Sequence, residues 1–94
     1  MHDERRMRFE GLFRSHAGAV RGYALRRTDP DEADDVVAET FLIAWRRFDD
    51  IPAYAAPWLL GVARRVLQYF AAPPPVEQAG NRVRIALFLH IPYS

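Results

Sequence analysis

The sequence predicts an all-α fold, a small bundle of three to four helices followed by a C-terminal tail of uncertain structure. Apolar residues recur at spacings of three and four through most of residues 4–70, which is the period of amphipathic helices. An acidic turn near residue 29 and prolines near residue 55 divide this pattern into three segments. Because 94 residues suffice for only one small core, we expect one helical domain over 1–72 and a Pro-rich linker with an apolar tail over 73–94.

The first helix is expected from Glu4 to Arg27. Its core face carries Phe9, Leu12, Phe13, Ala17, Val20, Tyr23 and Ala24. Three glycines interrupt the helix at 11, 18 and 22, and each weakens it by about 1 kcal/mol relative to alanine. This helix therefore needs tertiary packing to be stable.

The second helix is expected from Pro30 to about Phe48. Asp29 fits the N-cap, Pro30 the first helical position, and Glu32 the third position of a capping box. Acidic residues fill the first turns, and Arg46 and Arg47 fill the last, so both ends match the helix dipole.

This second helix has two distinct faces when it is plotted at about 100° per residue. The expected core stripe consists of Ala33, Val37, Thr40, Phe41, Ala44 and Phe48, with Val36 and Trp45 at its edges. The opposite face consists of Asp35, Glu39, Leu42 and Arg46, flanked by Ala38 and Ile43. Aliphatic residues ringed by charge are typical of a docking surface. The alternative is that the C-terminal tail covers them.

The third helix is expected from Pro57 to about Phe70, and the prolines at 73–75 end it. Its core stripe is Leu59, Val62, Ala63, Val66 and Phe70. Arg64 and Arg65 share the other side with Trp58 and Tyr69 at the border, an arrangement that can bind unstacked bases and phosphate. Taken alone, the residues favour core aromatics beside solvated arginines.

The tail alternates apolar residues with others from Val83 to Ile91, which favours a strand. A lone strand needs a partner, and three arrangements are open: pairing with a second copy of the chain, packing as a helix despite the pattern, or loose attachment.

The composition favours a binding protein over an enzyme. There is no cysteine for a disulfide or thiolate zinc site, and the three histidines lack metal-ligand spacing. No glycine-rich phosphate loop or nucleophile elbow is present, so no cofactor is expected. No apolar run reaches the length of a membrane span, and the charged first residues do not form a secretion signal, so we expect a cytoplasmic protein.

Three segments in order, "FEGLFRSHAGAVRGYALRR", "DPDEADDVVAETFLIAWRRF" and "PWLLGVARRVL", resemble region 2 of the bacterial extracytoplasmic function (ECF) sigma factors. The resemblance covers residues 9 to about 67, and its middle and last segments look most like actinobacterial versions. It implies the helical bundle of sigma region 2, a domain that binds core RNA polymerase and recognises and melts the upstream minus-ten promoter element.

The resemblance also assigns roles to residues. The second helix would dock on the coiled coil of the polymerase clamp through Asp35, Glu39, Leu42, Ile43 and Arg46. The loop after it would capture a flipped base of the single-stranded non-template promoter strand, and the next helix would line that strand. The implied DNA contacts are Asp50, Ile51, Tyr54, Trp58, Arg64 and Arg65.

The sequence departs from the family at Ala38, where glutamine is frequent, and beyond Leu67, where nothing resembles the usual helix-turn-helix domain. An alternative is therefore a truncated sigma-like regulator that competes for polymerase or for an anti-sigma factor without initiating transcription. A third hypothesis is self-association through the tail.

Overall fold

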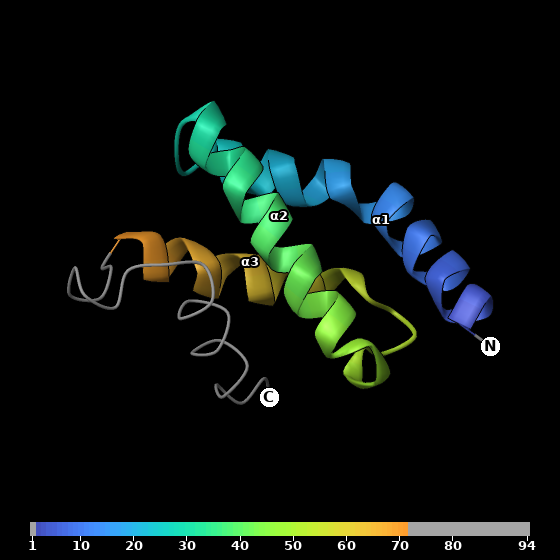
Figure 1. Cartoon of the computed structure of the whole chain (residues 1–94). Coiled ribbons are helices and arrows are strands. Elements are labelled where there is room, and N and C mark those ends of the chain that lie inside the picture. Colours follow the sequence, from blue (N-terminus) through green and yellow to red (C-terminus); the bar gives the residue numbers. More distant parts are fainter. Residues whose placement is uncertain (1, 72–94) are drawn as a thin grey trace, which may run out of the picture.

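The computed structural model describes residues 2–71, which form three α-helices and one short turn (Figure 1). Helix α1 spans His2–Leu25, α2 spans Pro30–Arg46 and α3 spans Ala56–Ala71, with a 3-10 turn, η1, at Phe48–Asp50. No strand occurs between residues 2 and 71. The all-α bundle is therefore confirmed there, while the predicted tail strand lies outside the described residues.

The start of α2 follows the local chemistry that the sequence predicts. Asp29 has extended backbone angles, and its carboxylate accepts a hydrogen bond from the Glu32 backbone N–H at 2.8 Å. Pro30 occupies the first helical position. The Glu32 carboxylate accepts a hydrogen bond from the Thr28 hydroxyl at 2.7 Å, so one half of the capping box forms and the other half is replaced by this contact.

The end of α2 differs slightly from the prediction. The helix stops at Arg46, and Phe48 belongs to η1, where the Arg47 guanidinium binds the Asp50 carboxylate through Nη2 at 3.0 Å. The α3 helix begins at Ala56, one residue before Pro57, a difference within the usual spread at helix ends.

Helix α2 packs against both other helices, and Figure 1 shows it crossing in front of them. On the α1 side the contacts are aromatic. The Phe9 ring lies edge-on to Phe41 and Trp45, with centroids 6.3 and 5.2 Å apart, and Phe13 lies edge-on to Phe41 at 4.9 Å. Edge-to-face pairs of this kind add to the stabilisation from buried area.

A single apolar core joins the three helices. The buried residues are Val20, Ala24, Ala33, Val36, Phe41, Ile43, Ala44, Ala55, Leu59, Val62, Ala63 and Val66. The predicted stripe of α3 is confirmed, with Leu59, Val62 and Val66 fully buried and Phe70 packed against the core. Within residues 2–71, no helix has both the length and the apolar character that crossing a bilayer requires.

Candidate functional site

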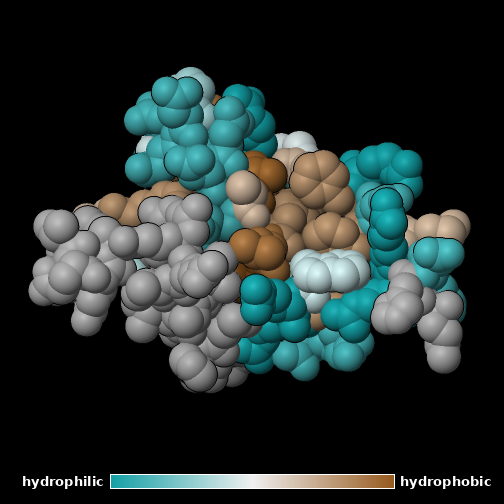
Figure 2. Space-filling model, in the orientation of Figure 1, coloured by the Kyte–Doolittle hydropathy of each residue, from teal (hydrophilic) through white to brown (hydrophobic). Residues whose placement is uncertain are grey.

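The outer face of α2 exposes apolar side chains among charged ones. Leu42 and Trp45 are each 38% exposed, and Asp35, Ala38 and Arg46 are exposed around them. Figure 2 shows apolar side chains gathered in the middle of the side of the molecule that α2 crosses, with hydrophilic residues at the margins. We call Asp35, Leu42, Trp45 and Arg46 the α2 outer face.

The sequence predicted that Ile43 and Glu39 lie on the exposed face of α2, and the structure shows that this prediction is wrong for both residues. Ile43 is fully buried in the core, and Glu39 is only 6% exposed. The sequence plot assumed one packed stripe, whereas α2 is packed on two sides, by α1 and by α3. The buried residues of α2 therefore lie on an arc of roughly 200° around the helix axis, with Glu39 at one edge and Phe41 at the other. This arc is about twice the width of an ordinary amphipathic stripe.

Two residues of this surface were not among the predicted contacts. Arg5 of α1 and Trp45 line a shallow groove together with Leu42 and Arg46. The Arg5 guanidinium lies 5.0 Å from the Trp45 ring centroid and donates a hydrogen bond to the Trp45 carbonyl oxygen at 3.0 Å. The position of Trp45 at the edge of the core stripe indicated that its ring could reach the surface. Nothing in the sequence places Arg5 beside it.

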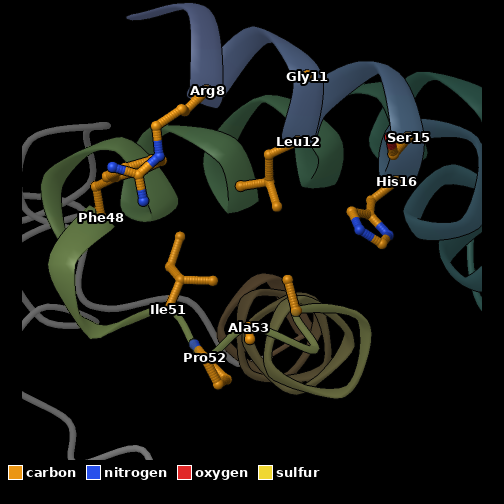
Figure 3. Close-up of a pocket in the computed structure, with 10 residues that line it drawn as sticks. Arg8, Gly11, Leu12, Ser15, His16, Phe48, Ile51, Pro52 and Ala53 are labelled. Carbon is orange, nitrogen blue, oxygen red and sulfur yellow. The ribbon is translucent and has the colours of Figure 1, made fainter. Parts of the chain in front are cut away.

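A second surface is a pocket of about 400 Å³ between α1 and the loop that follows α2. We call it the α1–loop pocket. Figure 3 shows Leu12 and Ile51 pointing toward each other across it, with Arg8 and His16 at opposite ends. Its lining residues are Arg8, Gly11, Leu12, Ser15 and His16 from α1, and Phe48, Ile51, Pro52, Ala53 and Ala55 from η1 and the loop.

Cation–ring contacts and ion pairs hold the loop side of this pocket. The guanidinium of Arg8 lies 5.2 Å from the Phe48 ring centroid, and that of Arg5 lies at the same distance. The two loop carboxylates are paired, Asp50 with Arg47 and, more loosely at 3.9 Å, Asp49 with Arg5. The negative charge beside the pocket is thereby partly offset.

The structure does not bring the three predicted loop contacts, Asp50, Ile51 and Tyr54, into one site. Ile51 lines the α1–loop pocket, but Asp50 is exposed and bound to Arg47 outside the lining. Tyr54 lies between two lining residues and is 76% exposed. The aromatic ring of Tyr54 is thus available at the surface, whereas Asp50 holds the turn together.

The predicted DNA contacts on α3 also differ in how exposed they are. Arg64 is exposed and Arg65 is half-buried. Trp58 and Tyr69 are half-buried and packed against the core, as the structural interpretation of the sequence expected. Of the predicted α3 residues, Arg64 is therefore the most accessible to a strand of DNA.

The α1 wall of the pocket was not recognised from the sequence. Arg8, Leu12, Ser15 and His16 lie on one side of the helix because they are spaced by three, four or eight residues. That spacing was a usable signal, but the loop that completes the pocket cannot be located from periodicity. Between residues 2 and 71, no group of three or more His, Cys, Asp or Glu side chains is arranged to hold a metal ion.

Comparison with known families identifies the family to which this fold belongs. Residues 12–71 match the sigma-70 region 2 family. The chain belongs to this family. The ECF-type resemblance of the three sequence segments is confirmed, and the family match includes the loop side of the α1–loop pocket and the α2 outer face.

Among known proteins the chain is similar to the ECF RNA polymerase sigma factor SigL of Mycobacterium tuberculosis. The identity is 43% over 60 residues, and the same values hold for SigL of strains H37Rv, CDC 1551 and Erdman. The aligned region covers 60% of this chain and 34% of SigL, so the chain matches about one third of its relative. No solved structure matches the chain significantly.

Proposed function

We propose that this sigma region 2 domain binds core RNA polymerase through the α2 outer face and binds the melted minus-ten promoter strand beside the loop and α3. The observation that carries the proposal is the exposure of Leu42 and Trp45 on a helix that is already packed on two sides. Both side chains still present part of their apolar surface to solvent, and exposed apolar side chains ringed by charge favour a protein partner. The likeness to SigL supports polymerase as that partner.

The clamp-binding residues that we propose are those the structure exposes. Leu42 and Trp45 supply apolar contact. Arg46, which lines the same groove, and Asp35, which is exposed about two turns earlier on α2, would orient the partner by charge. Ile43 and Glu39 are left out because both side chains are buried.

The proposed strand contacts lie on the loop and α3. Tyr54 offers an exposed ring on which a base can stack, and Arg64 offers an exposed guanidinium for a phosphate. Promoter melting would follow if the domain holds bases outside the duplex, since binding offsets the few kcal/mol that flipping a base costs.

Binding of the full chain to core RNA polymerase tests the docking surface. Leu42→Arg places a charge in the centre of the face and should weaken binding by tenfold or more, because a desolvated charge without a partner is costly. The control is Met7→Arg, which introduces the same side chain at a residue that is 67% exposed and about 200° around α1 from Phe9. Equal binding by wild type and Leu42→Arg, with both folded by circular dichroism, would refute the docking surface.

Run-off transcription then separates initiation from competition. The α2 outer face and the α1–loop pocket have no lining residue in common, so a protein can retain polymerase binding without holding DNA productively. A domain that initiates yields transcript from core polymerase on its own. A competitor yields none, and it lowers the transcript made with an intact ECF sigma factor.

A further inference from the structure

Helix α1 carries a row of side chains along its outer side. Figure 1 shows α1 along one border of the bundle, with α2 and α3 to the same side of it. Members of the row are spaced alternately by four and three residues, as in the contact rows of paired helices, and they fall within an arc of about 80°. All but Ala17 are exposed. The row consists of Asp3, Met7, Glu10, Arg14, Ala17 and Arg21.

The charge of this row changes sign at the middle of the helix. The acidic members, Asp3 and Glu10, precede residue 12, and the basic members, Arg14 and Arg21, follow it. A second α1 helix laid antiparallel, with a two-fold axis at residue 12, brings residue 10 opposite residue 14 and residue 3 opposite residue 21. Each carboxylate then faces an arginine of the second copy, and symmetry forms every pair twice. A parallel pair in register would instead place like charges together, which is unfavourable.

The charges at the centre of the row are available to a partner. Within residues 2–71, Arg14 takes part in no ion pair, and Glu10 pairs loosely with Arg6 at 3.5 Å on the surface. Arg21 binds the Asp34 carboxylate through Nε at 2.8 Å. A guanidinium has five N–H donors, so this contact leaves donors of Arg21 for a further carboxylate.

Phe13 supplies apolar surface beside the centre of the row. Its side chain is 42% exposed and lines a shallow groove with Phe9, Glu10 and Arg14. The two-fold axis is perpendicular to both helices, so the two Phe13 side chains lie on the same side of the contact. They are displaced by two residues, or about 3 Å, along the helices. Each ring therefore covers part of the other, as aromatic pairs do in protein interfaces.

We propose that this side of α1 binds a second copy of the chain, antiparallel and around a two-fold axis at residue 12. The row shares no residue with the α2 outer face or the lining of the α1–loop pocket, so the inference goes beyond the proposed function.

The size of the surface sets the strength of this association. Helix α1 has 24 residues, so it is about 36 Å long and about 10 Å wide, and a contact along it covers on the order of 400 Å² per copy. Standard stable interfaces cover about 800 Å² per partner. The dimer is therefore weak and reversible, with a dissociation constant on the order of 100 μM.

Reversal of single charges tests the pairing. Glu10→Arg places two arginines opposite each other, and Arg14→Glu places two carboxylates opposite each other. An equimolar mixture of these two variants restores unlike pairs in a heterodimer, and the double variant Glu10→Arg/Arg14→Glu restores them within one chain at the net charge of the wild type. Arg26→Glu is the control, because Arg26 is exposed and lies beyond the end of α1.

Sedimentation equilibrium of the full chain at low salt, from about 10 μM to about 1 mM, measures the association. Each single variant should associate at least tenfold more weakly than the wild type, while the mixture, the double variant and Arg26→Glu should stay within about threefold of it. Circular dichroism verifies that every variant is folded. The proposal is wrong if the wild type is monomeric throughout, if the single variants associate as it does, or if the mixture and the double variant fail to recover.

Binding to core RNA polymerase separates this inference from the docking function. Arg14→Glu should bind polymerase as the wild type does, because Arg14 is not part of the α2 outer face. If the wild type is monomeric and Arg14→Glu loses polymerase binding, the groove beside Phe13 belongs to the polymerase surface. That result would overturn self-association and leave the docking function standing.

Discussion

The guanidinium of Arg5 caps the end of α2 by donating a hydrogen bond to the Trp45 carbonyl oxygen at 3.0 Å, while it lies 5.0 Å from the Trp45 ring centroid. The last carbonyl groups of a helix have no partner within the helix, so a cation placed there satisfies one and also favours the negative end of the dipole. One side chain of α1 thus fixes both the backbone and the ring of a residue on the α2 outer face.

Replacing Arg5 by methionine should lower the free energy of unfolding by about 1 kcal/mol, since a charged hydrogen bond and two cation–ring contacts are lost at a partly exposed site. Urea denaturation measures the change. Arg6→Met is the matched control, because Arg6 is exposed and pairs loosely with Glu10, at 3.5 Å, on the surface of α1. That variant should stay within about 0.5 kcal/mol of the wild type, and equal losses in the two would contradict the capping role of Arg5.

The neighbours Leu42 and Ile43 have opposite environments, which gives a second prediction. Ile43→Val removes one methylene from a fully buried side chain and should lower the free energy of unfolding by about 1 kcal/mol. Leu42→Ala removes more atoms from a side chain that is 38% exposed, yet it should cost less than about 0.5 kcal/mol because alanine also favours the helix. Thermal denaturation of both proteins compares them directly, and a larger loss at Leu42 would mean that the assigned burial is wrong.

Leu42 and Ile43 also show how much of the fold can be predicted from the sequence. Local signals located the elements well: Asp29 and Pro30 begin α2, and the apolar spacing of α3 identifies its buried residues. Periodicity reveals that a helix has an apolar side, but not how many neighbours it packs against. Ile43 was therefore expected at the surface although α3 provides α2 with a second packed side.

The candidate site was predicted less completely than the fold, for a related reason. Leu42, Arg46, Tyr54 and Arg64 are exposed as expected, because each lies away from the packed sides of its element. The α1–loop pocket depends on a turn held by Arg47 and Asp50 and on Phe48 meeting Arg8, which are tertiary contacts. Such contacts have no period in the sequence, so the loop that completes the pocket against α1 could not be located.

Helix α1 should gain stability when one of its exposed glycines is replaced. Gly18→Ala should raise the free energy of unfolding by up to about 1 kcal/mol, since alanine favours the helix and a Cβ at this position would meet no atom within 4 Å. Gly61→Ala on α3 provides an independent comparison, because that glycine is also exposed and unobstructed. The two gains should add in the double variant, as measured by urea denaturation. A destabilised Gly18→Ala protein would show that the surface of α1 is more crowded than the structure indicates.

The exposed guanidinium of Arg64 should contribute to DNA affinity through charge alone. In a plot of log affinity against log salt concentration, Arg64→Gln should reduce the magnitude of the slope by about 0.7, the value for one phosphate contact on a single strand. Fluorescence anisotropy of a labelled single-stranded 20-mer with the full chain measures this slope. Arg26→Gln is the control because Arg26 is exposed just beyond the end of α1, outside the α1–loop pocket and the α2 outer face. If the two variants reduce the slope equally, DNA binding follows total charge, and the strand has no defined path along α3.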